Sequence, residues 1–146
     1  MALDFDAMAT AIAARYPALT PPAGLVAVRK ATGDLPQRMT VLPMVLVFPD
    51  AGTLEVGGGT RIGEHVFLAR FYFARSKDLA REVNACRRWL SKLIDAHADG
   101  MTAGGAVTAV RTVGWRLGRL DFGANTYTGV ELRLQVVTSD AWSPTA

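Results

Sequence analysis

The chain has 146 residues, of which half are hydrophobic and a fifth are charged. This balance is typical of a globular protein, and we expect residues 1–146 to form a single domain. The net charge of +3 is too small for a dedicated nucleic-acid-binding protein. No run approaches the roughly 20 apolar residues that cross a bilayer. Asp4 and Asp6 stand where a signal peptide would carry positive charge. We therefore expect a cytoplasmic protein with no membrane partner.

The first predicted helix spans residues 4–16. Its apolar residues recur at intervals of three or four, which is the spacing of one helix face. They are Phe5, Met8, Ile12 and Tyr16. Asp4 or Asp6 can accept hydrogen bonds from the N–H groups at the helix start. Residues 25–30 are then predicted as a short strand and residues 31–39 as a loop.

Residues 44–48 are predicted to form a strand that either starts after Pro43 or lies on a sheet edge, because proline cannot donate to a strand ladder. The strand has no polar face. This indicates burial on both sides, by the core and either by a partner or by a second layer of the same chain. A turn is predicted at 49–52, and residues 54–56 begin the next strand. The glycines at 57–59 lack the spacing of a phosphate-binding loop and are predicted to form a hairpin tip.

Residues 66–73 are rich in aromatic and branched side chains, which favours a strand. The period then changes, and we predict a long amphipathic helix at 77–98 with Ser76 as its cap. The apolar face of this helix consists of Leu79, Val83, Cys86, Leu90, Leu93, Ile94 and His97.

A final hairpin is predicted from strands at 107–120 and 126–138. The second strand alternates strictly between apolar and polar side chains, as a strand with one core face does. Residues 139–146 have no pattern and are predicted to form a flexible tail. Together these elements predict an α+β fold. We expect a two-layer sandwich, with a mostly antiparallel sheet and the helices 4–16 and 77–98 packed on one of its faces.

No set of residues has the spacing of a catalytic, cofactor-binding or metal-binding site. Cys86 is the sole cysteine, which excludes an internal disulfide, and its place on the apolar helix face favours a buried thiol. His65 and His97 are too isolated to supply the three or four ligands of a zinc site. His97 is instead expected to interact with the C-terminal end of its helix. The serines lack the G-x-S-x-G context of hydrolases. We expect no enzymatic activity, no cofactor and no metal.

The remaining candidate residues belong to a subunit interface. The two-sided apolar strand at 44–48 exceeds what one helical layer can cover, so a neighbouring copy is expected to contact it. A glycine tip can order against a partner, and arginine favours bidentate contacts with carboxylates or phosphates. The candidate interface residues are Met44, Leu46, Phe48, Gly57, Gly58, Gly59, Arg61, Arg70, Arg111, Arg116 and Arg133.

The order of these elements is itself informative. An N-terminal amphipathic helix precedes the strand LPMVLVFP at 42–49 and a long hairpin that ends in HVFLARFYFA at 65–74. The helix DLAREVNACRRWLSKLIDA at 78–96 and a last hairpin follow. Over residues 4–138, this layout resembles the tail terminator (tail-completion) proteins of long-tailed, non-contractile bacteriophages. The resemblance lies in the order of the elements and in the character of the quoted segments.

The resemblance implies a structural virion protein of the tail–neck junction, assembled in the host cytoplasm. Such proteins form a homohexameric ring that caps the tail tube, stops its polymerisation and offers a docking surface for head–tail joining. The implied partners are other copies of the chain, the tail-tube protein and the head–tail connector protein, with DNA passing through the lumen. The arginines would contact the ring and the tube or face that lumen. Two alternatives are another head–tail connector component, such as a neck or stopper protein, and a small nucleic-acid-binding module.

Overall fold

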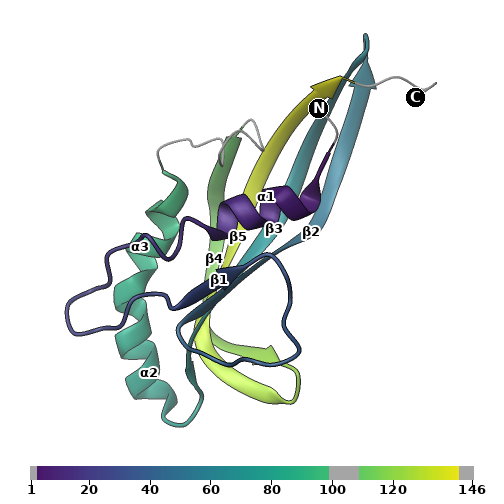
Figure 1. Ribbon diagram of the computed structural model, residues 1–146. Coiled ribbons are helices and arrows are strands. Elements are labelled where there is room, and N and C mark those ends of the chain that lie inside the picture. Colours follow the sequence, from purple (N-terminus) through teal and green to yellow (C-terminus); the bar gives the residue numbers. More distant parts are fainter. Residues whose placement is uncertain (1–2, 99–108, 142–146) are drawn as a thin grey trace.

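The computed structural model describes residues 3–98 and 109–141 (Figure 1). Its elements are α1 (Phe5–Ala13), β1 (Lys30–Thr32), β2 (Met44–Gly57), β3 (Thr60–Arg75), α2 (Leu79–Cys86), the 3-10 turn η1 (Arg87–Trp89), α3 (Leu90–Ile94), the 3-10 turn η2 (Asp95–His97), β4 (Ala109–Phe122) and β5 (Asn125–Ala141). The five strands form one sheet in the order β1-β2-β3-β5-β4. Only β1 and β2 run parallel. The predicted α+β class and mostly antiparallel sheet are confirmed.

The helices start at aspartates. Asp4 caps α1 by accepting a hydrogen bond from the N–H of Ala7 at 3.0 Å, which leaves one fewer unpaired donor at the helix start. Helix α1 ends at Ala13 and is therefore shorter than the predicted 4–16. No helix in the described ranges is both long and apolar enough to cross a membrane.

The predicted helix at 77–98 is a run of consecutive helical pieces, α2, η1, α3 and η2, that begins at Leu79. Its cap is Asp78, which accepts a hydrogen bond from the N–H of Arg81. The prediction that Ser76 caps the helix is wrong. The N–H of Ser76 donates to the carbonyl of Thr126 at 3.0 Å, so this residue still extends the sheet.

Strand β2 is one long strand where two strands and a turn at 49–52 were predicted. The chain passes Pro49 through a β-bulge, at which the register with β3 shifts between Pro49 and Ala51. Strand β1 lies at 30–32 instead of the predicted 25–30, and it pairs with β2 only up to Leu46. Beyond that point β2 is an edge strand of the sheet that the described residues form. An edge strand and a bulge both accept proline, because no neighbour needs its missing N–H.

Strand β5 is longer than predicted. It continues to Ala141, which pairs with Thr60 at the far end of β3. Residues 139–141 are therefore part of the sheet and not part of a flexible tail, while 142–146 lie outside the described residues. The N-terminal end of the predicted strand 107–120 also lies outside them, since the description of β4 begins at Ala109. The extension gives the distal end of β3 a partner on each side.

One face of the sheet, here called the inner face, carries the main hydrophobic core. Phe67 and Phe71 lie on this face, at alternate positions of β3. The edge of Trp89 meets Phe71 with 5.2 Å between ring centroids, and Phe5 of α1 stacks on Phe67. The core cluster combines sheet residues with helical residues. Its helical members are Met8, Ala9, Ile12, Ala13, Cys86, Trp89, Leu93 and Ala96.

A buried hydrogen bond joins the two helical regions. His97, at the end of the helical run, places its Nε2 atom 3.2 Å from the hydroxyl oxygen of Tyr16, just beyond α1. The sequence analysis placed His97 near its own helix end, and this bond joins it to a residue 81 positions earlier. Burial raises the pKa of the Tyr16 hydroxyl above its ordinary value, so it is a neutral hydrogen-bonding group at physiological pH.

The opposite face, here called the outer face, has a smaller core of its own. Met44 and Leu46 are fully buried there with Tyr72. The residues that cover them come from the loop before β2 and from the turn end of the β4–β5 hairpin. They are Met39, Leu42, Leu120, Phe122 and Tyr127. Of the two explanations left open for the two-sided apolar strand, the second layer of the same chain is therefore correct for this part of β2.

The packing of Trp89 can be tested by truncation. Its side chain is completely buried and meets Phe71. We expect Trp89→Ala to lower the free energy of unfolding by about 3–5 kcal/mol, because it removes this contact and leaves a cavity. Lys92→Ala, on the same helical run, should change it by less than about 0.5 kcal/mol. Urea denaturation measures both values, and equal effects of the two variants would contradict the packing described.

Candidate interaction site

The distal part of the β2–β3 hairpin, residues 50–65, is here called the arm. It projects beyond α1 (Figure 1). Its tip is a two-residue turn in which Gly58 and Gly59 both have positive φ, at 60° and 79°. Such turns match the twist of paired strands and favour glycine, which lacks the Cβ that would clash. The hairpin tip predicted at 57–59 is confirmed, and every residue from 49 to 60 is exposed.

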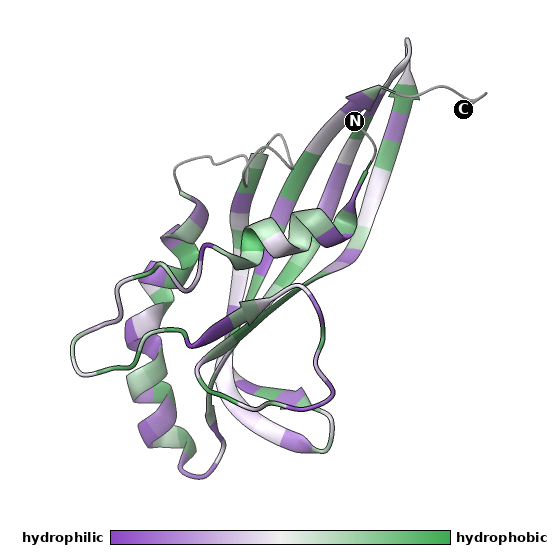
Figure 2. Cartoon of the chain, in the orientation of Figure 1, coloured by the Kyte–Doolittle hydropathy of each residue, from purple (hydrophilic) through white to green (hydrophobic). Residues whose placement is uncertain are grey.

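The arm exposes three large hydrophobic side chains. Leu54, Val56 and Ile62 are 52%, 46% and 49% exposed, and Figure 2 shows hydrophobic segments alternating with polar ones along the arm. Leu54 and Val56 lie on the inner face and Ile62 on the outer face, as their pairing with Gly63, Arg61 and Glu55 requires. These three residues were not among the predicted contact residues. The alternation Leu54–Glu55–Val56 was the available signal.

An ion pair inside the arm fixes β3 to β5. The guanidinium of Arg61 donates to both carboxylate oxygens of Asp140, from Nε at 3.1 Å and from Nη2 at 2.6 Å. Asp140 is buried, and its hydrogen bond from Arg61 lowers the pKa of its carboxyl group. Arg61 was predicted as an interface residue. The structure shows that its charge is already paired within the chain.

His65 packs at the base of the arm. Its Nε2 atom lies 3.1 Å from the hydroxyl of Thr138, and its ring meets Phe5 edge-on at 5.2 Å. Burial, together with the charge of Arg61, lowers the pKa of His65, so the ring is neutral at pH 7. Gly63 leaves room for this pair, since a Cβ there would stand 2.5 Å from the Thr138 hydroxyl. In the described residues no group of three or more His, Cys, Asp or Glu side chains converges to hold a metal ion.

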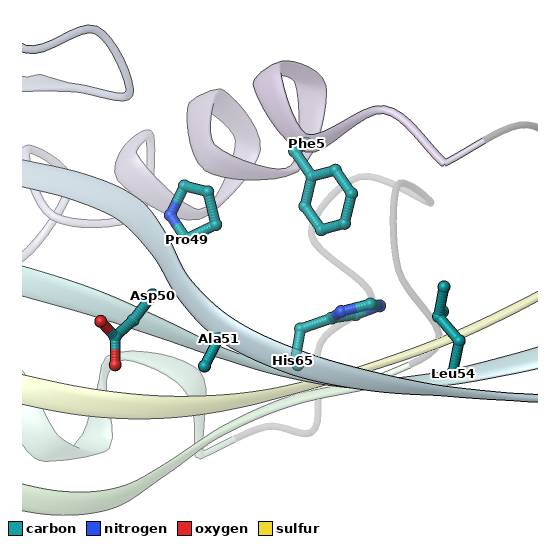
Figure 3. A pocket seen from close by; sticks show the side chains of 7 residues that line it. Phe5, Pro49, Asp50, Ala51, Leu54 and His65 are labelled. Atoms are coloured by element: carbon teal, nitrogen blue, oxygen red, sulfur yellow. The ribbon is translucent and has the colours of Figure 1, made fainter.

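A pocket of about 370 Å³ opens between α1 and the arm. Phe5 projects from the helix toward His65, and Leu54 stands on the distal side (Figure 3). The lining residues are Phe5, Pro49, Asp50, Ala51, Gly52, Leu54 and His65. The pocket lies beside the part of β2 that pairs with β3 but has no strand on its other side among the described residues. An apolar side chain from another molecule could enter it from that edge, and no residue in its lining has the arrangement of a nucleophile and base.

Phe48 and Arg70 lie together on the outer face. Arg70 donates to Glu131 at 2.7 Å and places its guanidinium 5.2 Å from the centre of the Phe48 ring. Hydrogen bonding to Glu131 raises the pKa of Arg70 despite partial burial. Both residues were predicted as interface residues. Here Phe48 is half-buried and packs against the outer-face cluster, and the charge of Arg70 is balanced within the sheet.

The other three predicted arginines are exposed on the outer face. Arg111 donates to the side-chain oxygen of Gln135 at 2.7 Å, and Arg116 donates to the backbone carbonyl of Arg119 at 3.2 Å. Arg133 lies between them, on the neighbouring strand β5. These side chains form one positively charged strip along β4 and β5. In the described part of the chain, Arg111 and Arg116 contact neutral oxygens and not carboxylates.

The two edges of the sheet differ in charge. Beyond Leu46, β2 carries the acidic residues Asp50 and Glu55, both exposed. The opposite edge strand, β4, carries three exposed arginines at positions 111, 116 and 119. It also exposes Trp115, of which 55% is accessible to solvent. Trp115 was not among the predicted interface residues, although a tryptophan between two arginines in a strand is a recognisable signal.

Met44 and Leu46 must be removed from the set of candidate interface residues. Both side chains are completely buried inside one copy of the chain, so neither can contact a partner in this conformation. Cys86 is buried as expected, and burial raises its pKa to about 12. A thiol with that pKa stays protonated at neutral pH and is a poor nucleophile.

The comparisons with known proteins add no identification. No protein-family model matches the chain, and no curated protein matches its sequence.

The Arg61–Asp140 ion pair predicts a dependence of stability on acid. Because the folded-state pKa of Asp140 lies below its ordinary value of 3.8, the unfolded state binds more protons. The contribution of the pair is thus present above about pH 4 and is lost as the pH falls through the lower folded-state pKa. We expect Asp140→Asn to be less stable than the wild type at pH 7 and the difference to shrink below about pH 4.

Urea midpoints measured across this pH range test the expectation, with Asp95→Asn on the helical run as the matched control. A difference between Asp140→Asn and the wild type that stays constant into strong acid would show that the charge of Asp140 does not stabilise the fold.

Proposed function

We propose that this chain is the tail terminator of a long-tailed, non-contractile bacteriophage. In this role it forms a homohexameric ring on the last ring of tail-tube subunits, stops tube growth and presents the surface for head–tail joining. The observation that carries the proposal is the arm, a long hairpin that extends past the helices and exposes Leu54, Val56 and Ile62. Large apolar side chains that stay exposed on a projection mark a surface that contacts other molecules.

A capping ring requires each subunit to touch two neighbouring subunits and the tube. The chain offers separate surfaces for these contacts: the open edge of β2 with the pocket beside it, the opposite edge β4, and the tip of the arm. The interface between ring subunits is heterologous, which means that it joins two different surfaces. The two differently charged sheet edges satisfy that requirement.

In the proposed ring, α1 and the helical run from Leu79 to His97 form one layer over the inner face. This arrangement leaves the outer face and the arm to neighbouring molecules. The mechanism is steric. The ring occupies the growing end of the tube and so denies the next tube subunit its binding site. The proposed partners are other copies of this chain, the tail-tube protein and the head–tail connector protein, at the tail–neck junction of the virion.

The exposed arginine strip favours a second candidate, a nucleic-acid-binding module. Arg111, Arg116 and Arg133 share the outer face and have no carboxylate partner among the described residues. Three phosphate contacts would make duplex binding weaken with salt with a logarithmic slope of about −3. If purified protein shows no duplex binding at about 50 mM salt, this alternative is excluded. DNA that merely passes through a ring does not require such affinity.

Deletion of the gene tests the proposal by electron microscopy of the particles. We expect overlong or headless tails, because nothing then stops polymerisation or joins the head. Wild-type protein supplied in trans should restore normal tails. Normal tails beside heads that leak DNA would instead indicate a neck component on the head side. Intact infectious particles would contradict the proposal altogether.

The role of the arm can be tested in the same complementation assay. Val56→Asp places a charge on the arm, and Val26→Asp makes the same change at an equally exposed residue outside it. We expect Val26→Asp to restore tail length fully and Val56→Asp to leave at least about tenfold fewer normal tails, since a desolvated charge at a contact costs several kcal/mol. Equal complementation by both variants would show that the arm is not needed for tail termination.

A further inference from the structure

The two open edges of the sheet are compatible in direction. Strand β2 is antiparallel to β3, β3 to β5 and β5 to β4, so β2 and β4 run in opposite directions. If a second copy is placed beside the first with its strands running in the same directions, its β4 lies antiparallel to the free edge of β2. The sheet then continues from copy to copy with its inner and outer faces preserved.

The charges on the two edges are also compatible, and they select the same pairing. Glu55 of β2 and Arg111 of β4 both lie on the outer face, since their cross-strand partners are Ile62 and Gln135. Opposite charges on one face of adjacent strands attract, and like charges repel. Pairing of β2 with β2 would join two acidic edges, and pairing of β4 with β4 would join two basic ones. Only the β2–β4 combination brings opposite charges together.

The inner face supplies a matching apolar contact. Trp115 faces this side of β4, because its partner in β5 is the core residue Leu132. The pocket formed by Phe5, Leu54 and His65 lies on the same side of β2. Gly52, in the floor of the pocket, has no side chain that would block an incoming ring. An exposed tryptophan and an apolar pocket are the usual components of an interface hot spot.

We propose that residues 109–119 of β4 of one copy pair antiparallel with the free edge of β2 of a second copy, with Trp115 seated in the Phe5–Leu54–His65 pocket. The end of β4 beyond Arg119 takes no part, because β1 occupies that stretch of β2. In the register that achieves this, Glu55 stands opposite Arg111 and Gly52 opposite Trp115. Trp115 is one position further from Arg111 along β4 than Gly52 is from Glu55 along β2. The extra residue is Val113, at the bulge of β4. Thr53 then stands opposite Gly114. The contact is heterologous, so it can repeat from copy to copy. Because this register shifts each copy along the strands, a closed ring requires strands that are tilted from the ring axis, as in a β-barrel. It rests on the proposed function only for the size of that ring.

Disulfide trapping tests the register. The double variant Thr53→Cys/Gly114→Cys places one thiol on each edge, and Gly114 accepts a side chain because an added Cβ would stand 3.7 Å from its nearest neighbour. The control is Thr53→Cys/Ala109→Cys. Ala109 lies in the same cross-sheet row as Thr53 and would be its partner only if the copies joined without a stagger. Cys86 is fully buried and does not compete.

Mild oxidation of the folded protein at about 100 µM, followed by non-reducing electrophoresis, should give a ladder of dimers up to a closed ring for Thr53→Cys/Gly114→Cys. The control variant should remain mostly monomeric, as should either single-cysteine parent. Circular dichroism of each variant establishes that it is folded. A ladder of equal strength in the control, or no ladder in either variant, overturns the proposal.

A charge exchange tests the pairing without cysteines. Glu55→Arg and Arg111→Glu each place like charges across the edge and should weaken self-association at least about tenfold in sedimentation experiments. An equimolar mixture should regain it, because in an alternating ring every β2 edge again meets a β4 edge of opposite charge. Asp95→Arg and Arg87→Glu make the same changes at exposed helical positions and should have no effect. Failure of the mixture to recover overturns the pairing.

The outcome is separable from that of the proposed function. Self-association is measured on the purified chain, whereas tail capping is measured on particles. A protein that forms no ladder but still caps tails would refute the edge pairing and keep the terminator role. A protein that forms the predicted ladder while its deletion leaves tails unchanged would do the reverse.

Discussion

Strand β3 is paired with β2 on one side and with β5 on the other along nearly its whole length, and this double pairing sets the position of almost every other group. Because side chains alternate along a strand, Phe67 and Phe71 face the helices while Arg70 and Tyr72 face the opposite way. A shift by one residue would exchange the two sets and bury an arginine in the main core. The free-energy cost of burying that arginine therefore fixes the register of β3.

In the arm, strand β3 is supported by β5, whereas strand β2 forms an open edge. Arg61 with Asp140, and His65 with Thr138, bind β3 to β5 through buried polar contacts. Buried polar groups of this kind are stable only when each has a partner, so these pairs keep the distal sheet in one conformation. Strand β2 of the arm has no such support, because no further strand of the described chain pairs with its other side. Its free backbone groups and exposed Leu54 and Val56 are left for another molecule.

Open edges normally invite unwanted pairing, and charge is one way in which proteins limit it. Here one edge carries Asp50 and Glu55, and the other carries Arg111 and Arg116. Like edges repel, so two copies cannot join through the same edge without cost. This asymmetry allows a directional contact between unlike edges and opposes a symmetric dimer. A ring is the closed form of such a contact.

Local patterns in the sequence were sufficient for several elements. The aromatic run at 66–73 lies in β3, and the 3.6-residue spacing from Leu79 corresponds to the helical run that ends at His97. The glycine tip at 57–59 also lies where the pattern places it. Pro49 was misread as a turn because the rule for proline in strands depends on whether the strand lies at an edge. The position of the edge depends on where β1 docks, which no local pattern specifies.

The candidate site shows the same division. The exposure of Arg133 follows from its alternation with the buried Leu132 and Leu134, a local property. The burial of Met44 and Leu46 does not, since it depends on the β4–β5 hairpin end and a loop folding over the outer face. The pairing of Arg61 with Asp140 joins residues 79 positions apart. The sequence alone thus determined the class of each long element, because periodicity is a property of consecutive residues. Only the tertiary structure decided which charges are paired and which edges are free, because those depend on the order of strands in space.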